Sequence, residues 1–222
     1  MTRVVNGASP SGRSRNPCAV PSGAHRLSGV SRGRVDEGVA NLDVCLREAQ
    51  KSPADDGIVE LIVRRPAVDE RELLDEATLA LDIGIVGDTW SVRSSPSTAD
   101  GSPHPDAQVT LMNARVIAHL AQTPERWALA GDQLYLDLDL SYDNLPPGTQ
   151  LALGSAVIEV TAKPHTGCFK FRDRFGDEAL RIVNSPAGKV QRLRGVNARI
   201  VRAGTVRRGD RVRKLAAGST ES

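Results

Sequence analysis

The chain has 222 residues, of which 40% are hydrophobic and only 3% aromatic, and its formal net charge is +2. This length allows one large domain or two small ones, with a core built mainly from Val, Leu, Ile and Ala. No run approaches the ~20 apolar residues of a membrane span, and the N-terminus lacks the apolar stretch of a secretory signal. Three scattered cysteines give no disulfide framework and favour a cytoplasmic location.

Charge is distributed unevenly along the chain. Residues 1–35 hold six Arg and no acid, residues 36–162 hold 8 basic and 22 acidic side chains, and residues 163–214 hold 15 basic and 4 acidic ones. A positive field over the last stretch would attract an anionic ligand such as a phosphate-bearing cofactor. The plainer interpretation is a solvated basic face.

The first part of the chain predicts a tail followed by a mixed region of helix and strand. Residues 1–35 are rich in Ser, Gly, Arg and Pro without apolar periodicity, which predicts disorder. We therefore expect a single domain over residues 36–215 and a short polar tail over 216–222. The expected elements are a short helix at 39–50, a strand at 57–65, a helical or extended segment at 70–81, a glycine turn at 84–90 and a polar loop at 91–105.

Short strands dominate the second half. Strands are expected at 108–112, 134–140, 151–153, 156–162, 193–201 and 211–215, with helices at 114–121, behind the cap Asn113, and at 176–183. Alternating leucines over 134–140 predict a strand with one buried and one solvent-facing side, and Tyr135 is expected on the solvent side. Many closely spaced strands with few helices predict a β-rich α+β fold, a barrel with short helices on its outside.

The densest chemistry lies in residues 163–175. A Pro-x-x-Gly-Cys turn ends at Cys168, and Lys170 and Arg172 follow it. Cations beside a thiol favour its thiolate, which is the form that acts as nucleophile and metal ligand. His165 is the candidate proton acceptor for Cys168. The alternative is a buried cysteine that serves as a small hydrophobic side chain.

Several runs in the chain carry a family resemblance. They are GDQLYLDLDLSYDNLPPGTQLALGSAVIEVTAKPHTGCFKF, then RFG, RGVNARIV and AGTVRRGDRV, with GIVGDTW upstream. Together they resemble the MOSC domain, the family related to the C-terminal domain of molybdenum cofactor sulfurases. The resemblance covers residues 57–215.

The resemblance implies a strand-rich barrel and a loop cysteine, here Cys168, that carries sulfur as a persulfide or ligates molybdenum. It implies that Cys168 is catalytic and is the metal ligand; His165, inferred from its place beside Cys168, is the second candidate catalytic residue. The residues expected to bind the molybdenum cofactor through its anionic pterin are Lys163, Lys170, Arg172, Asn197 and Arg199. The protein would be a sulfur-carrying transferase or a component of a molybdenum-dependent oxidoreductase, served by a sulfur-donor protein. The family's association with pyridoxal phosphate belongs to an aminotransferase-like domain that 222 residues do not accommodate beside this one.

Two other classes of function are weighed against this one. The first is a non-catalytic binding module that uses the basic C-terminal segment for an anionic partner. Nucleic acid is not expected as that partner, because no nucleic-acid motif is present and stacking aromatics are scarce. The second is a thiol hydrolase, which needs a partnered histidine and a third orienting group. Only His165, of four histidines, lies near Cys168 in the sequence.

Overall fold

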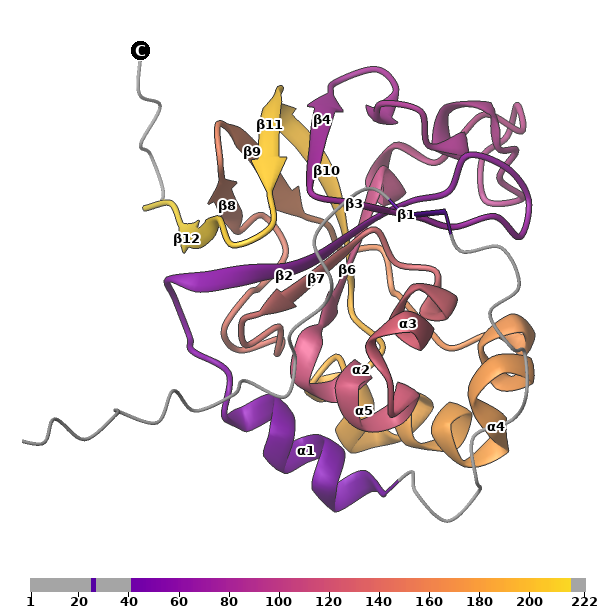
Figure 1. The fold of residues 1–222 in the computed structure, drawn as a ribbon, viewed down its shortest axis with the longest axis vertical. Helices are drawn as coiled ribbons and strands as arrows, with labels where there is room; N and C mark the ends of the chain where they lie inside the picture. The colour runs from indigo at the N-terminus through magenta and orange to yellow at the C-terminus, as the bar shows by residue number, and fades with distance from the viewer. Residues whose placement is uncertain (1–24, 27–40, 217–222) are drawn as a thin grey trace, which may run out of the picture.

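The fold is built on a closed barrel of seven strands, seen in a computed structural model that describes residues 25–26 and 41–216 (Figure 1). Around the barrel the strands are β2 (Gly57–Arg64), β12 (Arg211–Lys214), β8 (Gln150–Leu153), β9 (Ala156–Val160), β10 (Val196–Arg202), β6 (Val109–Asn113) and β7 (Leu134–Asp137). β7 then pairs with β2 and closes the ring. All neighbours are antiparallel except β6 and β7, which are parallel. The predicted β-rich barrel is confirmed.

Short strands extend this barrel on one side. β3 (Glu72–Leu74) pairs with β2, and β1 (His25–Arg26) pairs with β3. A separate sheet has the order β11 (Gly204–Arg207), β4 (Glu76–Ala80) and β5 (Gly84–Ile85). The helical interpretation of residues 70–81 is therefore wrong, since this segment forms β3 and β4. Residues 204–207, which lie between two of the predicted strands, also form a strand.

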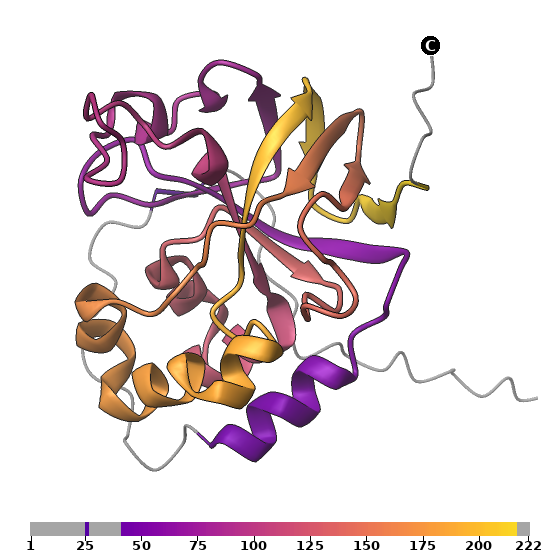
Figure 2. The same cartoon turned by 180° about the vertical axis from the view of Figure 1, so that it is seen from behind.

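Five helices gather at one end of the barrel (Figures 1 and 2). They are α1 (Leu42–Gln50), α2 (Ala114–Ala121), α3 (Pro124–Trp127), α4 (Phe169–Asn184) and α5 (Pro186–Val190). Short 3₁₀ turns occur at Thr89–Val92, Pro105–Ala107 and Ala128–Ala130. Asn113 ends β6 and caps α2, because its side chain accepts hydrogen bonds from the backbone N–H groups of Arg115 and Val116. The predicted cap and helix are confirmed.

The longest helix differs from its prediction. α4 begins at Phe169 rather than at Gly176, so the cysteine turn ends one residue before a helix. Gly176 has φ 89° and ψ 169°, which kinks α4 at its middle. This backbone conformation is accessible to glycine and strained for other residues. The expected helix at 176–183 is therefore the second half of α4.

The molecule has two apolar cores, and several barrel strands contribute residues to both. One fills the barrel interior and includes Leu134, Leu136 and Leu138. The other lies between the barrel and the helices and includes Tyr135 and Trp127. The solvent-facing position expected for Tyr135 is wrong, because helices cover that side of β7. Its hydroxyl donates to the Trp127 carbonyl at 2.7 Å, which satisfies the buried phenol.

Some expectations fall outside the described residues. The tail predicted over residues 1–35 lies there apart from His25–Arg26, which form β1. The polar tail at 216–222 lies there from residue 217 onward. Within residues 25–26 and 41–216, every helix is too short or too polar to span a bilayer.

Candidate functional site

Cys168 stands at the surface, immediately before α4. Its thiol is exposed, and its backbone carbonyl accepts hydrogen bonds from the N–H groups of Phe171 and Arg172, the first bonds of the helix. The alternative that Cys168 is a buried hydrophobic side chain is therefore wrong. That description applies to Cys45, which is fully buried in the helical core. Burial raises the pKa of the Cys45 thiol to about 12.

The segment that carries Cys168 is tied down at both ends. The Asn197 side chain donates to the carbonyls of Lys163 and Pro164 at 3.1 and 3.2 Å. At the other end, Asn184 accepts from the Gly167 N–H at 2.9 Å and donates to its carbonyl at 3.1 Å. A Cβ at Gly167 would lie 2.7 Å from a Leu180 methyl, which explains the glycine before the cysteine. These hydrogen bonds fix the backbone on the N-terminal side of Cys168 and so limit where its thiol can lie.

Cys168 lines a cleft of about 690 Å³, which we call the cysteine cleft. Its cationic lining residues are Arg65, Arg71, Arg93, Lys163, Lys170, Arg174 and Arg194. Among the described residues that line it, only Asp69 carries a carboxylate. Low-dielectric walls lined by one sign of charge concentrate ions of the opposite sign. The cleft is therefore suited to an anion.

Two arginines converge at the base of the cysteine cleft. Arg71 Nη2 and Arg174 Nη1 lie 3.8 and 3.9 Å from the point where a Cβ of Gly131 would stand. Burial, followed by the charges of Arg174 and Arg65, lowers the pKa of Arg71 to about 10. Neighbouring positive charges thus repel one another here, and a bound anion would relieve that repulsion.

Arg174 pairs with Asp69 and Arg194 pairs with Asp132. The charge of Arg65 is likewise compensated. Its guanidinium holds both carboxylate oxygens of Asp88 at 2.8 and 2.9 Å, and both side chains are buried. The remaining Nη1 donates to the Gly131 carbonyl at 3.1 Å. Arg65 therefore fixes the glycine turn at 84–90 and the floor of the cleft rather than offering a free charge.

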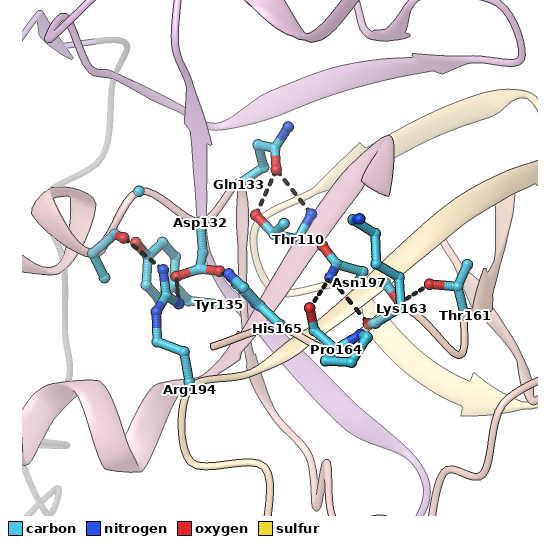
Figure 3. Close-up of polar contacts among 12 residues, drawn as sticks. Thr110, Asp132, Gln133, Tyr135, Thr161, Lys163, Pro164, His165, Arg194 and Asn197 are labelled. Carbon is cyan, nitrogen blue, oxygen red and sulfur yellow. Dashed lines mark hydrogen bonds and ion pairs between the residues drawn. The ribbon is translucent and has the colours of Figure 1, made fainter. Parts of the chain in front are cut away.

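His165 lies against a buried ion pair (Figure 3). Asp132 is fully buried, and its Oδ2 accepts from Arg194 Nη1 at 2.6 Å. His165 Nδ1 lies 3.5 Å from Asp132 Oδ1, and neither of these two atoms has a closer hydrogen-bond partner. Burial, followed by the charges of Arg194 and Arg65, lowers the pKa of His165 well below its ordinary value. Its imidazole is therefore neutral at neutral pH.

The structure separates the predicted site residues into two groups. Cys168, His165, Lys163 and Lys170 all line the cysteine cleft. Arg172, Asn197 and Arg199 do not line it. Arg172 is exposed beside Asp173 and Asp177, and Arg199 pairs with Glu159 at 2.6 Å. The Asn197 amide acts on the cleft only through the backbone that it anchors.

Most of the cleft's charge comes from residues that sequence reasoning did not select. Arg71, Arg174 and Arg194 lie before β3, in α4 and before β10. Arg174 falls within the cysteine segment and was visible there as one of its cations. Arg71, Arg194 and Asp132 carried no local signal, because only the closure of the barrel brings them together.

Two residues that line the cleft hold unsatisfied hydrogen-bond donors. Trp90 Nε1 and Arg194 Nε are buried, and neither has a partner among the residues that the structure describes. Buried donors of this kind are rare in native proteins. Among residues 25–26 and 41–216, no group of three or more His, Cys, Asp or Glu side chains is placed to hold a metal ion.

A match between the sequence and a family model shows to which family the chain belongs. The MOSC domain model matches residues 99–213, more than half of the chain, so this protein belongs to the MOSC domain family. The family is linked to molybdenum cofactor sulfurase-type chemistry.

The fold is also similar to solved structures. The YUAD protein from Bacillus subtilis is 14% identical, over 70% of this chain and 93% of that chain, with a TM-score of 0.52. YiiM from Escherichia coli is 21% identical, over 70% of this chain and 68% of that chain, with a TM-score of 0.46. No curated protein matches the chain. At these identities the likeness concerns the fold alone.

Proposed function

We propose that this MOSC domain binds a phosphate-bearing pterin of the molybdenum-cofactor type in the cysteine cleft, with the thiolate of Cys168 as the reactive group. The observation that carries the proposal is an exposed thiol on the wall of a cleft with seven lining cations and one lining carboxylate. Phosphate suits such a lining because guanidinium groups bind it through paired hydrogen bonds. Thiolate suits molybdenum because soft ligands favour such metals.

The lining residues would have different binding roles, according to where they lie in the cleft. Arg71 and Arg174, whose guanidinium groups lie close together, are the candidates for holding the phosphate, which would compete with Asp69 for Arg174. Lys163 and Lys170 flank Cys168 in the chain and supply positive potential on its side of the cleft. When bound, the molybdenum centre would supply oxidation–reduction chemistry, with Cys168 as its protein ligand.

The same thiol is suited to carrying sulfur. In that role the Cys168 thiolate attacks the outer sulfur of a donor persulfide, as supplied by a sulfur-donor protein. A new S–S bond forms to Cys168, the donor's S–S bond breaks, and the donor leaves as a thiolate, so no outside oxidant is required. His165, which lines the same cleft, is the candidate acceptor of the thiol proton.

The alternative function, a non-catalytic binding module, depends on an unpaired basic surface over residues 163–214, and the fold leaves less of that surface unpaired. Seven cations of residues 163–214 pair with carboxylates of the acidic stretch 36–162, and they are Arg174, Arg194, Arg199, Arg207, Arg208, Arg211 and Arg213. The charge separation along the chain is thus compensated in three dimensions. A broad basic face for a macromolecular partner is correspondingly reduced.

The test measures metal and sulfur on the purified full chain. Elemental analysis and intact mass are compared for the wild type, Cys168→Ala and the matched control Cys45→Ala, whose thiol is buried. Each protein is measured as purified and after incubation with cysteine persulfide. We expect molybdenum, or a reductant-reversible gain of one sulfur atom, in the wild type and in the control, with loss in Cys168→Ala.

Two outcomes separate the roles, and a third rejects both. Molybdenum that depends on Cys168 indicates the ligand role, whereas added sulfur that depends on Cys168 indicates the carrier role. If the wild type holds neither after persulfide treatment and cofactor loading, or if Cys168→Ala retains as much as Cys45→Ala, the proposed function is wrong.

A further inference from the structure

A second cavity lies on the other side of the cysteine segment. It has a volume of about 430 Å³ and shares Lys163, His165 and Arg194 with the cysteine cleft. Residues 163–166 form the wall between the two cavities. We call the second cavity the Tyr142 pocket, after the aromatic residue that lines it.

The charges of the Tyr142 pocket are all of one sign. Lys163, Lys189, Arg192 and Arg194 line it, and none of its described lining residues carries a carboxylate. Arg194 pairs with Asp132 behind the wall, whereas the other three have no ion pair with a carboxylate of the described chain. Most cations of this basic stretch are paired, so three uncompensated charges around one cavity indicate an anion site.

The other walls of the Tyr142 pocket are apolar. Val183 and Val196 are buried beside it, and Pro147, Ala162 and Pro164 line its more exposed part. Such a lining favours a ligand with a hydrocarbon or aromatic body, because desolvation of apolar surface supplies part of the binding free energy. A small hydrated anion such as inorganic phosphate would leave these walls without a partner.

One cation of the pocket is held in place before any ligand arrives. The Arg192 guanidinium lies 4.8 Å from the centroid of the Tyr142 ring, and its Nη1 donates to the Leu145 carbonyl at 2.6 Å. The Tyr142 N–H donates to the Val190 carbonyl at 3.1 Å, which ties this loop to α5. A fixed guanidinium loses little rotamer entropy on binding.

We propose that the Tyr142 pocket is a second ligand site, for a small anion with an apolar or aromatic body, such as an aryl carboxylate. The anionic group lies between Lys189 and Arg192, and the body contacts Val183 and Val196. The site is separate from the one that contains Cys168, and the inference does not depend on molybdenum or sulfur chemistry.

The test is a fluorescence titration of the full chain with 8-anilinonaphthalene-1-sulfonate, an aromatic anion. Lys189→Glu is compared with Lys170→Glu, a matched reversal of another exposed helical lysine that lines only the cysteine cleft. We expect saturable binding that Lys189→Glu weakens by about tenfold, the effect of ~1.4 kcal/mol. Probe that binds in the cysteine cleft instead responds to Lys170→Glu, so the Tyr142 site is the binding component that Lys189→Glu weakens and that Lys170→Glu leaves unchanged.

Two further measurements test the shape and the charge of the ligand. Ala162→Trp places a large side chain in the pocket from an exposed position and is expected to abolish binding. 2-Naphthoate is expected to displace the probe, whereas inorganic phosphate at the same concentration is not. Non-saturable binding, or equal affinity in the wild type, Lys189→Glu and Ala162→Trp, would overturn the proposal. The outcome is independent of the metal and sulfur measurements, which concern Cys168.

Discussion

The buried pair of Asp132 and Arg194 gives the sharpest prediction about stability. The two side chains are 0% and 7% exposed, and Arg194 Nη1 lies 2.6 Å from Asp132 Oδ2. Asp132→Asn keeps the shape of the side chain but leaves the Arg194 charge without its counterion. Removal of one partner from such a pair costs about 3–5 kcal/mol. With a urea dependence of roughly 2 kcal/mol per M, the unfolding midpoint falls by about 1.5–2.5 M.

Urea unfolding followed by tryptophan fluorescence measures this loss, because Trp127 is buried in the core beside the helices. The matched control is Glu76→Gln, which breaks an exposed pair with Arg207 and is expected to cost less than about 1 kcal/mol. The double variant Asp132→Leu with Arg194→Met removes both charges and is expected to recover much of the loss. If Asp132→Asn costs no more than the Glu76 control, the account of this pair is refuted.

Three further predictions concern single positions. The unfolded chain binds a proton at His165 near pH 6.5, whereas the folded chain does so only at lower pH, so stability falls by about 1.4 kcal/mol per pH unit below ~6.5. Urea midpoints at pH 7.5, 6 and 5 check this, since His165→Gln is expected to lack that part of the slope. Gly195→Ala is expected to cost roughly 2–5 kcal/mol, because φ is +100° there and an added Cβ would overlap the Leu111 carbonyl oxygen; thermal unfolding that matches the wild type would contradict it. Asn113→Ala is expected to cost about 2 kcal/mol, because it removes the cap of α2 and the hydrogen bonds to Ser52 and the Leu138 carbonyl; unchanged far-UV circular dichroism with a lowered midpoint is the expected signature.

Local patterns predicted most of the strands and helices because those patterns act over a few residues. Asn113 was identified as a helix cap from the sequence because capping depends on its immediate neighbours. Tyr135 was misplaced because alternation gives the two sides of a strand but does not say whether helices cover the second side. Residues 70–81 were ambiguous because their charges fit a solvated helix as well as exposed strand positions.

The site was only partly predictable, for a related reason. Cys168 and its neighbouring lysines form one continuous segment, so their chemistry is visible in the sequence. Arg71 comes from another part of the chain and reaches the same cleft only because the barrel closes, and the buried Asp132 reaches the cleft residue Arg194 in the same way. Charge counts along the chain indicated a positive field over residues 163–214, but folding brings acidic residues to many of these cations. Arg211 and Arg213, for example, both pair with the distant Asp56.

The closure of the barrel also bears on how the chain reaches its fold during synthesis. β2 leaves the ribosome early, yet its two neighbours in the ring are β7 and β12, and β12 is the last strand described. Until Arg211–Lys214 is made, one edge of β8 has no partner, and the edge of β2 that pairs with β3 at Ile62–Arg64 is open at Gly57 and Ile58. Open edges of this kind pair readily with other chains. A ribosome that stops before Arg211 therefore releases an aggregation-prone open sheet, even though the cysteine segment is already complete.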